Sequence, residues 1–258
     1  MNNQKKKGIL IAAMGLPSVG KSSVIRELGM LLGCKTLIEK EESYWNQAIS
    51  DRDKNHDFFT ANMSFRCMRV PYYYEASRDV EEGKLVLLDT FYDKLSYLYM
   101  EDKVNFKWLF DDDSAYYNSL KEIVKLDYEN LPDADYLIFF DIERDVWKKF
   151  MVKRGRKLDE NKDFINSFDG IKKMKEAVDE YKKYLEENKK KLKIIKVKQK
   201  YDSANRIALS VFAQLLHEEE IVNYLRANNK INADEKDEYI KEIKEKYDPK
   251  DNPKNKEE

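Results

Sequence analysis

Short apolar runs alternate along this chain with stretches in which apolar residues recur every three or four positions. The apolar runs cover residues 8–14, 35–38, 85–88, 136–140 and 192–197. Helical spacing is found at residues 24–32, 57–80, 145–153, 171–190 and 204–215. Strands that alternate with helices predict a parallel sheet with helices on both faces. We therefore expect an α/β fold, a three-layer α/β/α domain built around five parallel strands.

The remaining segments divide the chain into a main domain and a tail. The pattern predicts a short helix at 44–49, a break or bend at Pro71, and mostly helical structure over 90–131. From about residue 228 the chain is almost wholly charged or polar. We thus expect one domain over 1–227 and a solvated extension over 228–258, helical at 238–247 and disordered beyond.

Composition argues against several classes of protein. The 258 residues include 48 lysines and arginines and 49 acidic residues, so the formal net charge is −1. A general nucleic-acid binder would usually be basic, and we expect no nucleic-acid partner. No run of about 18 apolar residues occurs, so we expect no membrane span. Cys34 and Cys67, like His56 and His217, lack metal-ligand spacing, and the two thiols suit the reducing cytoplasm.

The first apolar run leads into a loop that fits the pattern Gly, four residues, Gly-Lys-Ser. Backbone N–H groups of such a P-loop point into one concavity, and the following helix adds its partial positive charge. Lys21 can then reach the β- and γ-phosphates of ATP, and the Ser22 hydroxyl can ligate Mg²⁺. We predict that ATP binds to Gly15, Leu16, Pro17, Ser18, Val19, Gly20, Lys21, Ser22 and Ser23. The alternative, a fortuitous turn, conflicts with the strand before the loop and the helix after it.

Acidic residues follow the next strands of the predicted sheet. Glu39 comes after the second strand, Asp89 after the third and Asp141 after the fourth. Because ligands of such sheets bind beyond the carboxyl ends of the strands, Glu39 and Asp89 should lie near the phosphates. A carboxylate there can hold Mg²⁺ or its waters, or accept a proton from an attacking hydroxyl. The alternative is that these acids are simply polar strand ends.

Further motifs follow the P-loop in a recognisable order. Residues 38–45 read Ile-Glu-Lys-Glu-Glu-Ser-Tyr-Trp, and residues 59–62 read Phe-Thr-Ala-Asn, with Arg69 seven positions beyond. Residues 88–93 read Leu-Asp-Thr-Phe-Tyr-Asp, and residues 153–160 read Lys-Arg-Gly-Arg-Lys-Leu-Asp-Glu. Together they resemble the motifs of the deoxynucleoside kinase and thymidylate kinase group of P-loop enzymes. The resemblance covers roughly residues 8–216.

The resemblance implies roles for the first of these motifs. Glu39 would act as general base on the sugar 5′-hydroxyl, and Trp45 would line the nucleoside pocket. Lys40 stands where the family has proline, and Trp45 lies one residue late, so Glu41 is a rival for the base. The alternative for Trp45 is an ordinary core aromatic.

The next two motifs match the family less closely. Asn62 stands where the family has a glutamine that hydrogen-bonds the base, and Arg69 would help to orient the site. Asn62 could equally be a polar residue on the exposed side of a helix. Asp89 matches the family acid after the third strand, but Thr90 replaces the arginine that follows it there. Another cation would have to substitute for that arginine, or activity would be low or redirected.

The last motif resembles the lid of these kinases. Arg154 and Arg156 would close over the γ-phosphate, with the lid at about 154–166. A lid of this kind also excludes water from the reacting groups. The alternative is that both arginines are surface cations.

We therefore predict an ATP- and Mg²⁺-dependent phosphotransferase whose acceptor is the 5′-hydroxyl of a (deoxy)nucleoside. The predicted catalytic residues are Lys21, Glu39, Asp89, Arg154 and Arg156, with Ser22 and Asp89 at the metal. A nucleoside monophosphate kinase, a kinase of another small acceptor, and a nucleotide-binding regulatory protein without transfer activity remain alternatives. A phosphotransferase acting on a protein or a nucleotide-sugar is a further one. The resemblance also implies a homodimer.

Overall fold

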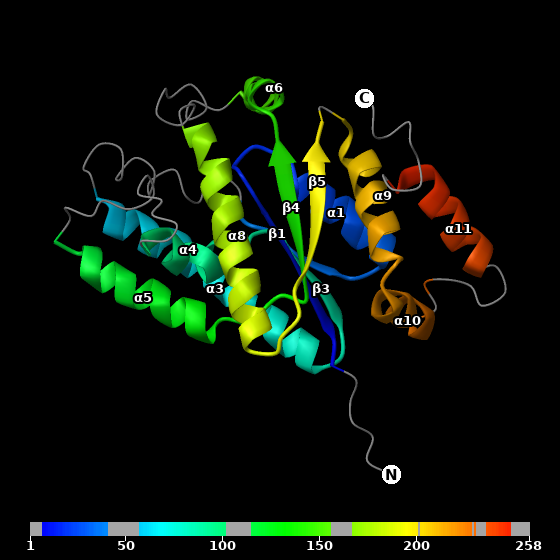
Figure 1. The fold of residues 1–258 in the computed structure, drawn as a ribbon, viewed down its shortest axis with the longest axis horizontal. Helices are drawn as coiled ribbons and strands as arrows, with labels where there is room; N and C mark the ends of the chain where they lie inside the picture. The colour runs from blue at the N-terminus through cyan, green and yellow to red at the C-terminus, as the bar shows by residue number, and fades with distance from the viewer. Residues whose placement is uncertain are drawn as a thin grey trace, which may run out of the picture.

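The computed structural model describes residues 7–40, 57–101, 115–155, 167–200, 202–228, 230 and 236–248. These residues contain one sheet with the strand order β2-β3-β1-β4-β5. Its strands are β1 (Ile9–Gly15), β2 (Lys35–Leu37), β3 (Leu85–Leu88), β4 (Tyr136–Ile142) and β5 (Lys193–Gln199). Strands β1, β3, β4 and β5 are labelled in Figure 1. Every neighbouring pair of strands is parallel. The predicted five-stranded parallel sheet is therefore confirmed.

The position of each strand in the sheet follows from its pattern of burial. β1 is central, and every one of its residues is buried, as a strand needs when both of its faces are covered. β5 lies at one edge, where from Ile195 to Gln199 buried and exposed residues alternate. A continuous apolar run therefore marks the centre of this sheet, and an alternating run marks its edge.

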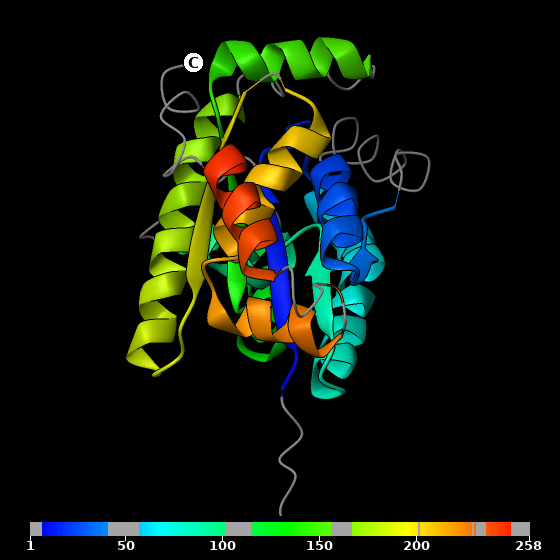
Figure 2. The same cartoon turned by 90° about the vertical axis from the view of Figure 1, so that its right-hand side faces the viewer.

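Helices cover both faces of the sheet, which confirms the predicted three layers (Figures 1 and 2). One face carries α1 (Lys21–Leu32), α9 (Ala204–Leu215), α10 (Glu219–Ala227) and α11 (Lys236–Tyr247). The other carries α3 (Phe58–Glu81), α4 (Tyr92–Met100), α5 (Tyr117–Asn130) and α8 (Gly170–Glu187), which follows a 3₁₀ turn at Ser167–Asp169. α6 (Arg144–Arg154) lies across the carboxyl ends of the strands. None of the described helices is sufficiently long and apolar to cross a membrane.

α3 continues without interruption across Pro71. A proline inside a helix removes one backbone hydrogen bond and crowds the preceding turn. Val70, Tyr73 and Ala76 are nevertheless buried around it, and the helix packs against β3 and β1. The predicted break is therefore wrong, because packing against the sheet offsets the lost hydrogen bond.

In the part that the structure describes, the predicted extension over 228–258 packs against the domain, which the sequence analysis did not expect. α10, which lies just before the tail and within the predicted domain 1–227, was not predicted. α11 confirms the helix expected at 238–247, and it packs against α9. Ile240 and Ile243 are buried among the charged residues of α11. Two isoleucines three positions apart lie on the same side of a helix and attach it to the domain.

A contact at the end of α11 holds the same segment to the domain. Asp248 is fully buried, and its Oδ2 lies 2.6 Å from Nε2 of His217. His217 follows α9, so the two ends of the segment over 217–248 lie side by side. The disorder expected from residue 248 onward concerns residues outside the described part of the chain, apart from Asp248 itself.

Replacing Ile243 with alanine tests whether α11 stabilises the domain. We expect Ile243→Ala to lower the free energy of unfolding by about 2 kcal/mol, since it removes buried methyl groups and leaves a cavity. Urea denaturation followed by circular dichroism measures the change. Glu242→Ala, at an exposed position beside it, is the control and should change the free energy by less than about 0.5 kcal/mol. Equal stabilities of the two variants would contradict the docking of α11.

Candidate active site

The P-loop connects β1 to α1 at the carboxyl edge of the sheet. Gly20 has φ 83° and Ser18 has φ 66°, both in the left-handed region, so the backbone reverses tightly there. Two side chains from other elements hold loop carbonyls in place. Trp147 Nε1 of α6 donates to the Pro17 carbonyl at 2.8 Å, and Gln199 Nε2 of β5 donates to the Val19 carbonyl at 2.7 Å. The sequence did not single out either side chain.

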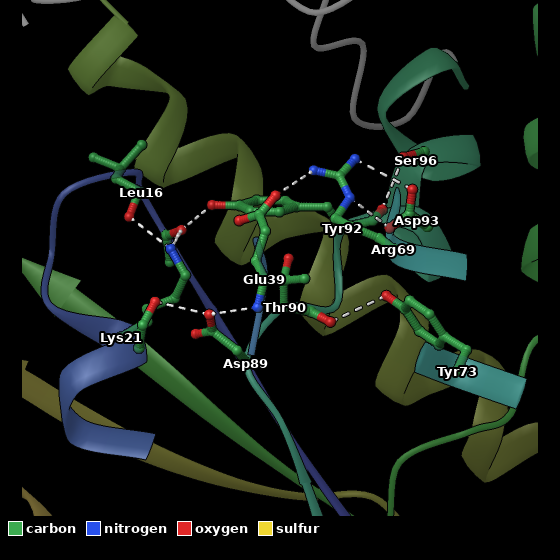
Figure 3. Close-up of polar contacts among 12 residues, drawn as sticks. Leu16, Lys21, Glu39, Arg69, Tyr73, Asp89, Thr90, Tyr92, Asp93 and Ser96 are labelled. Atoms are coloured by element: carbon green, nitrogen blue, oxygen red, sulfur yellow. Dashed lines mark hydrogen bonds and ion pairs between the residues drawn. The ribbon is translucent and has the colours of Figure 1, made fainter. Parts of the chain in front are cut away.

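Lys21, the first residue of α1, folds back onto the loop (Figure 3). Its Nζ donates to the carbonyl oxygens of Gly15 at 3.1 Å and Leu16 at 3.0 Å. Burial lowers the pKa of Lys21, and the nearby carboxylates of Asp89 and Glu39 oppose that effect. The ammonium group thus lies in the concavity of the loop, where its positive charge would stabilise a bound anion.

Ser22 and Asp89 form the pair that the sequence predicted as a metal site. The Ser22 hydroxyl donates to Asp89 Oδ2 at 2.7 Å, and the backbone N–H of Glu39 donates to the same oxygen at 3.3 Å. Asp89 Oδ1 is buried and accepts no hydrogen bond from the described residues. The oxygens of Ser22 and Asp89 are the kind of ligand that Mg²⁺ prefers. The Ser22 hydroxyl directs its proton at the carboxylate, so the lone pairs of the serine oxygen remain for a cation. Burial raises the pKa of Asp89, and the charge of Lys21 opposes this rise.

Glu39 and Arg69 meet at the same edge of the sheet. Arg69 of α3 donates to Glu39 Oε1 at 3.3 Å through one terminal nitrogen. Its other nitrogens make a bidentate pair with Asp93 in the first turn of α4, at 2.8 and 3.2 Å. Figure 3 shows the guanidinium between the two carboxylates. The structure therefore places Glu39 and Arg69 together and adds Asp93, which stands in the motif at residues 88–93 but was given no role from the sequence.

Asn62 lies on α3 seven residues before Arg69, which is two helical turns. The two side chains therefore start from the same side of the helix. Asn62 is half-buried, and its amide donates to the Phe58 carbonyl of its own helix at 2.8 Å. Arg66, between them, is held away by a bidentate pair with Asp127 of α5, at 2.6 and 2.7 Å.

Thr90 lies beside these groups with a buried hydroxyl. Its Oγ1 has no hydrogen-bond partner among the described residues, and its carbonyl accepts a hydrogen bond from Tyr73 at 3.2 Å. The resemblance leads one to expect an arginine at the position of Thr90. In the structure Arg69, from α3, lies nearby and pairs with Glu39.

Arg154, at the end of α6, approaches the P-loop from the other side. One of its terminal nitrogens donates to Ser18 Oγ at 2.5 Å, although the side chain is exposed. Arg156, Trp45, the rival base Glu41 and residues 156–166 of the expected lid lie outside the described residues. Their predicted roles remain predictions.

Replacing Asp89 with asparagine tests how the buried carboxylate affects the stability of the ligand-free protein and, separately, its binding of Mg²⁺. The folded state holds the carboxyl at a raised pKa, so its ionised form destabilises the protein at neutral pH. We expect the ligand-free Asp89→Asn protein to have a higher Tm than the wild type at pH 7. The difference should shrink as pH falls toward the ordinary value of 3.8, because the wild-type carboxyl then takes up its proton.

Thermal denaturation between pH 7 and pH 4 measures this effect. Because Ser22 and Asp89 are predicted to hold Mg²⁺, addition of Mg²⁺ should raise nucleotide affinity in the wild type and not in this variant, since an amide is a weaker ligand than a carboxylate. A lower Tm for Asp89→Asn at every pH would contradict the electrostatic analysis.

Comparison with known proteins places the fold. No protein-family model and no curated protein sequence matches this chain. A structure of deoxyadenosine kinase from M. mycoides, with the products dCMP and dCDP bound, is similar over 80% of this chain and 98% of its own, at 19% identity and a TM-score of 0.51. A structure of thymidylate kinase from Candida albicans is similar over 83% of this chain and 94% of its own, at 15% identity and a TM-score of 0.50. The chain therefore has the fold of P-loop nucleoside and nucleotide kinases.

Proposed function

We propose that this protein is an ATP-dependent kinase that transfers the γ-phosphate to the 5′-hydroxyl of a (deoxy)nucleoside. The observation that carries the proposal is the position of Glu39. Its carboxylate is held by Arg69 through a 3.3 Å ion pair, and its backbone N–H reaches the Asp89 carboxylate that binds Ser22 of α1. A carboxylate that could accept a proton thus lies beside the P-loop, which supports the role of Glu39 as general base. A hydroxyl acceptor needs such a base, whereas a phosphate acceptor is already a nucleophile.

The parts of phosphoryl transfer would be distributed over the chain as follows. The loop amides and Lys21 would hold the donor phosphates, and Arg154 would reach the γ-phosphate from α6. Ser22 and Asp89 would hold Mg²⁺, which supplies positive charge to the phosphate oxygens when it is bound. Glu39 would orient the acceptor hydroxyl and take its proton, while Arg69 keeps the carboxylate in place.

The acceptor side of the site would lie along α3. Asn62, two helical turns from Arg69, carries the amide that would hydrogen-bond the edge of a base. Asp93 fixes the Arg69 guanidinium from the opposite side at 2.8 Å, so its direction toward Glu39 is preorganised. With Trp45 and the lid, these residues would form the nucleoside pocket.

Product analysis tests the proposal directly. The purified protein is incubated with γ-labelled ATP, Mg²⁺ and a panel of nucleosides and nucleoside monophosphates, and the products are separated by chromatography. The proposal predicts label on a nucleoside 5′-position. Label on monophosphates alone would support the monophosphate kinase, and ATP binding without any labelled product would support a regulatory protein.

Lys21→Ala should abolish transfer and leave the fold intact. The loss follows because the Lys21 ammonium, which lies against the carbonyls of the loop, is the group that would neutralise the β- and γ-phosphates. Circular dichroism checks the fold, and the rate of product formation checks the activity. Unchanged turnover would defeat the assignment of the donor site.

Glu39→Gln should lower kcat with a nucleoside acceptor by roughly 10²- to 10⁴-fold, the usual contribution of a general base. The amide keeps the shape of the side chain but cannot accept the proton. Asp141→Asn is the matched control, because Asp141 also lies near the end of its strand but is exposed. Equal rates for the Glu39 variant and the control would show that Glu39 is not the base.

A further inference from the structure

Tyr92, the first residue of α4, lies between the P-loop and the Glu39–Arg69 pair (Figure 3). Lys21 Nζ is 5.4 Å from the centre of its ring, and the guanidinium carbon of Arg69 is 5.8 Å from it. The Tyr92 hydroxyl donates a hydrogen bond to the carbonyl oxygen of Gly15. The proposed reaction gives Tyr92 no part, so its contacts need a separate explanation.

The Gly15 carbonyl accepts two hydrogen bonds in this state. One comes from Tyr92, and the other comes from Lys21 Nζ at 3.1 Å. A carbonyl oxygen has two lone pairs, so both are engaged. Gly15 is buried, and water therefore has little access to replace a donor that leaves.

Binding of a nucleoside triphosphate would remove one of these donors. Lys21 has to turn from the carbonyls of Gly15 and Leu16 toward the phosphates, because a P-loop lysine neutralises the β- and γ-phosphates. A buried carbonyl left without any donor is unfavourable. The hydroxyl of Tyr92 remains on the Gly15 oxygen and prevents that loss.

The surroundings of Tyr92 fix it as a donor. The next residue, Asp93, is held by Arg69, and the Ser96 hydroxyl donates to the Tyr92 carbonyl at 2.8 Å. Burial raises the pKa of the Tyr92 hydroxyl, and the negative charge of Glu39 raises it further. The hydroxyl therefore keeps its proton at neutral pH.

We propose that Tyr92 is a positioning residue of the donor site, whose hydroxyl holds the Gly15 carbonyl while Lys21 moves to the phosphates. The inference rests on the proposed function in one respect, that the P-loop binds a nucleoside triphosphate. On this inference Tyr92 contributes to the affinity of the P-loop for the β- and γ-phosphates and takes no part in phosphoryl transfer.

A double-mutant cycle tests this role. Isothermal titration calorimetry measures the Kd of AMP-PNP with Mg²⁺ for the wild type, Tyr92→Phe, Lys21→Ala and the double variant. Tyr92→Phe should weaken binding roughly three- to tenfold, the usual worth of one hydrogen bond. In the Lys21→Ala background the same change should have no effect, because no ammonium has to leave the Gly15 carbonyl.

Two comparisons keep the test decisive. Tyr73→Phe removes a hydroxyl that binds the Thr90 carbonyl in the same region, and it should leave the Kd unchanged. AMP, which lacks the β- and γ-phosphates, should bind equally well to the wild type and to Tyr92→Phe. This second comparison applies even where Lys21→Ala binds AMP-PNP too weakly for a Kd.

Specific outcomes would overturn the inference. Unchanged AMP-PNP affinity in Tyr92→Phe, or an equal loss with and without Lys21, would leave Tyr92 a merely structural residue. An equal loss for AMP and AMP-PNP would do the same. If the wild type bound no AMP-PNP at all, the proposed function would fail and this inference with it.

Discussion

The carboxyl edge of the parallel sheet is the constraint on which the rest of the structure depends. Because β1 lies between β3 and β4 and all pairs are parallel, the segments that leave β1, β2 and β3 emerge on the same side. Those segments carry the P-loop, Glu39 and Asp89. Ser22 and Asp89 are 67 positions apart in the sequence, yet they meet at 2.7 Å. The order and parallel direction of the strands therefore determine where the P-loop, Glu39 and Asp89 meet, and the side chains determine which contacts form there.

Charge at this edge is concentrated and largely removed from water. Burial raises the pKa values of Asp89 and Asp93 and lowers that of Lys21, so each ion alone would be destabilising there. Their proximity to one another, together with Arg69, compensates for part of this cost. Buried charges that lower folding stability but hold a fixed geometry are expected at a site that is preorganised for a charged ligand.

Several features of the structure could not be predicted from the sequence, for identifiable physical reasons. α10 was missed in a region rich in charge. The helix of α11 was predicted but its packing on α9 was not, because its two buried isoleucines are too few to stand out from its polar residues. Pro71 predicted a break, but the packing of α3 against β3 and β1 overrides the local preference. Tyr92 and Asp93 stand in the motif at residues 88–93 but were given no role there, and their contacts appear only once α4 is placed beside α3 and the P-loop.

The sequence by itself determined the strands, the P-loop and the acids at the strand ends, because each depends on a local pattern of apolar residues, glycines and carboxylates. It could not determine which charges pair. The contacts of Arg69 with Glu39 and Asp93, and of Tyr92 with the Gly15 carbonyl, join residues 24 to 77 positions apart. Only the tertiary structure brings such residues together, since it alone sets how α3 and α4 pack at the carboxyl edge of the sheet.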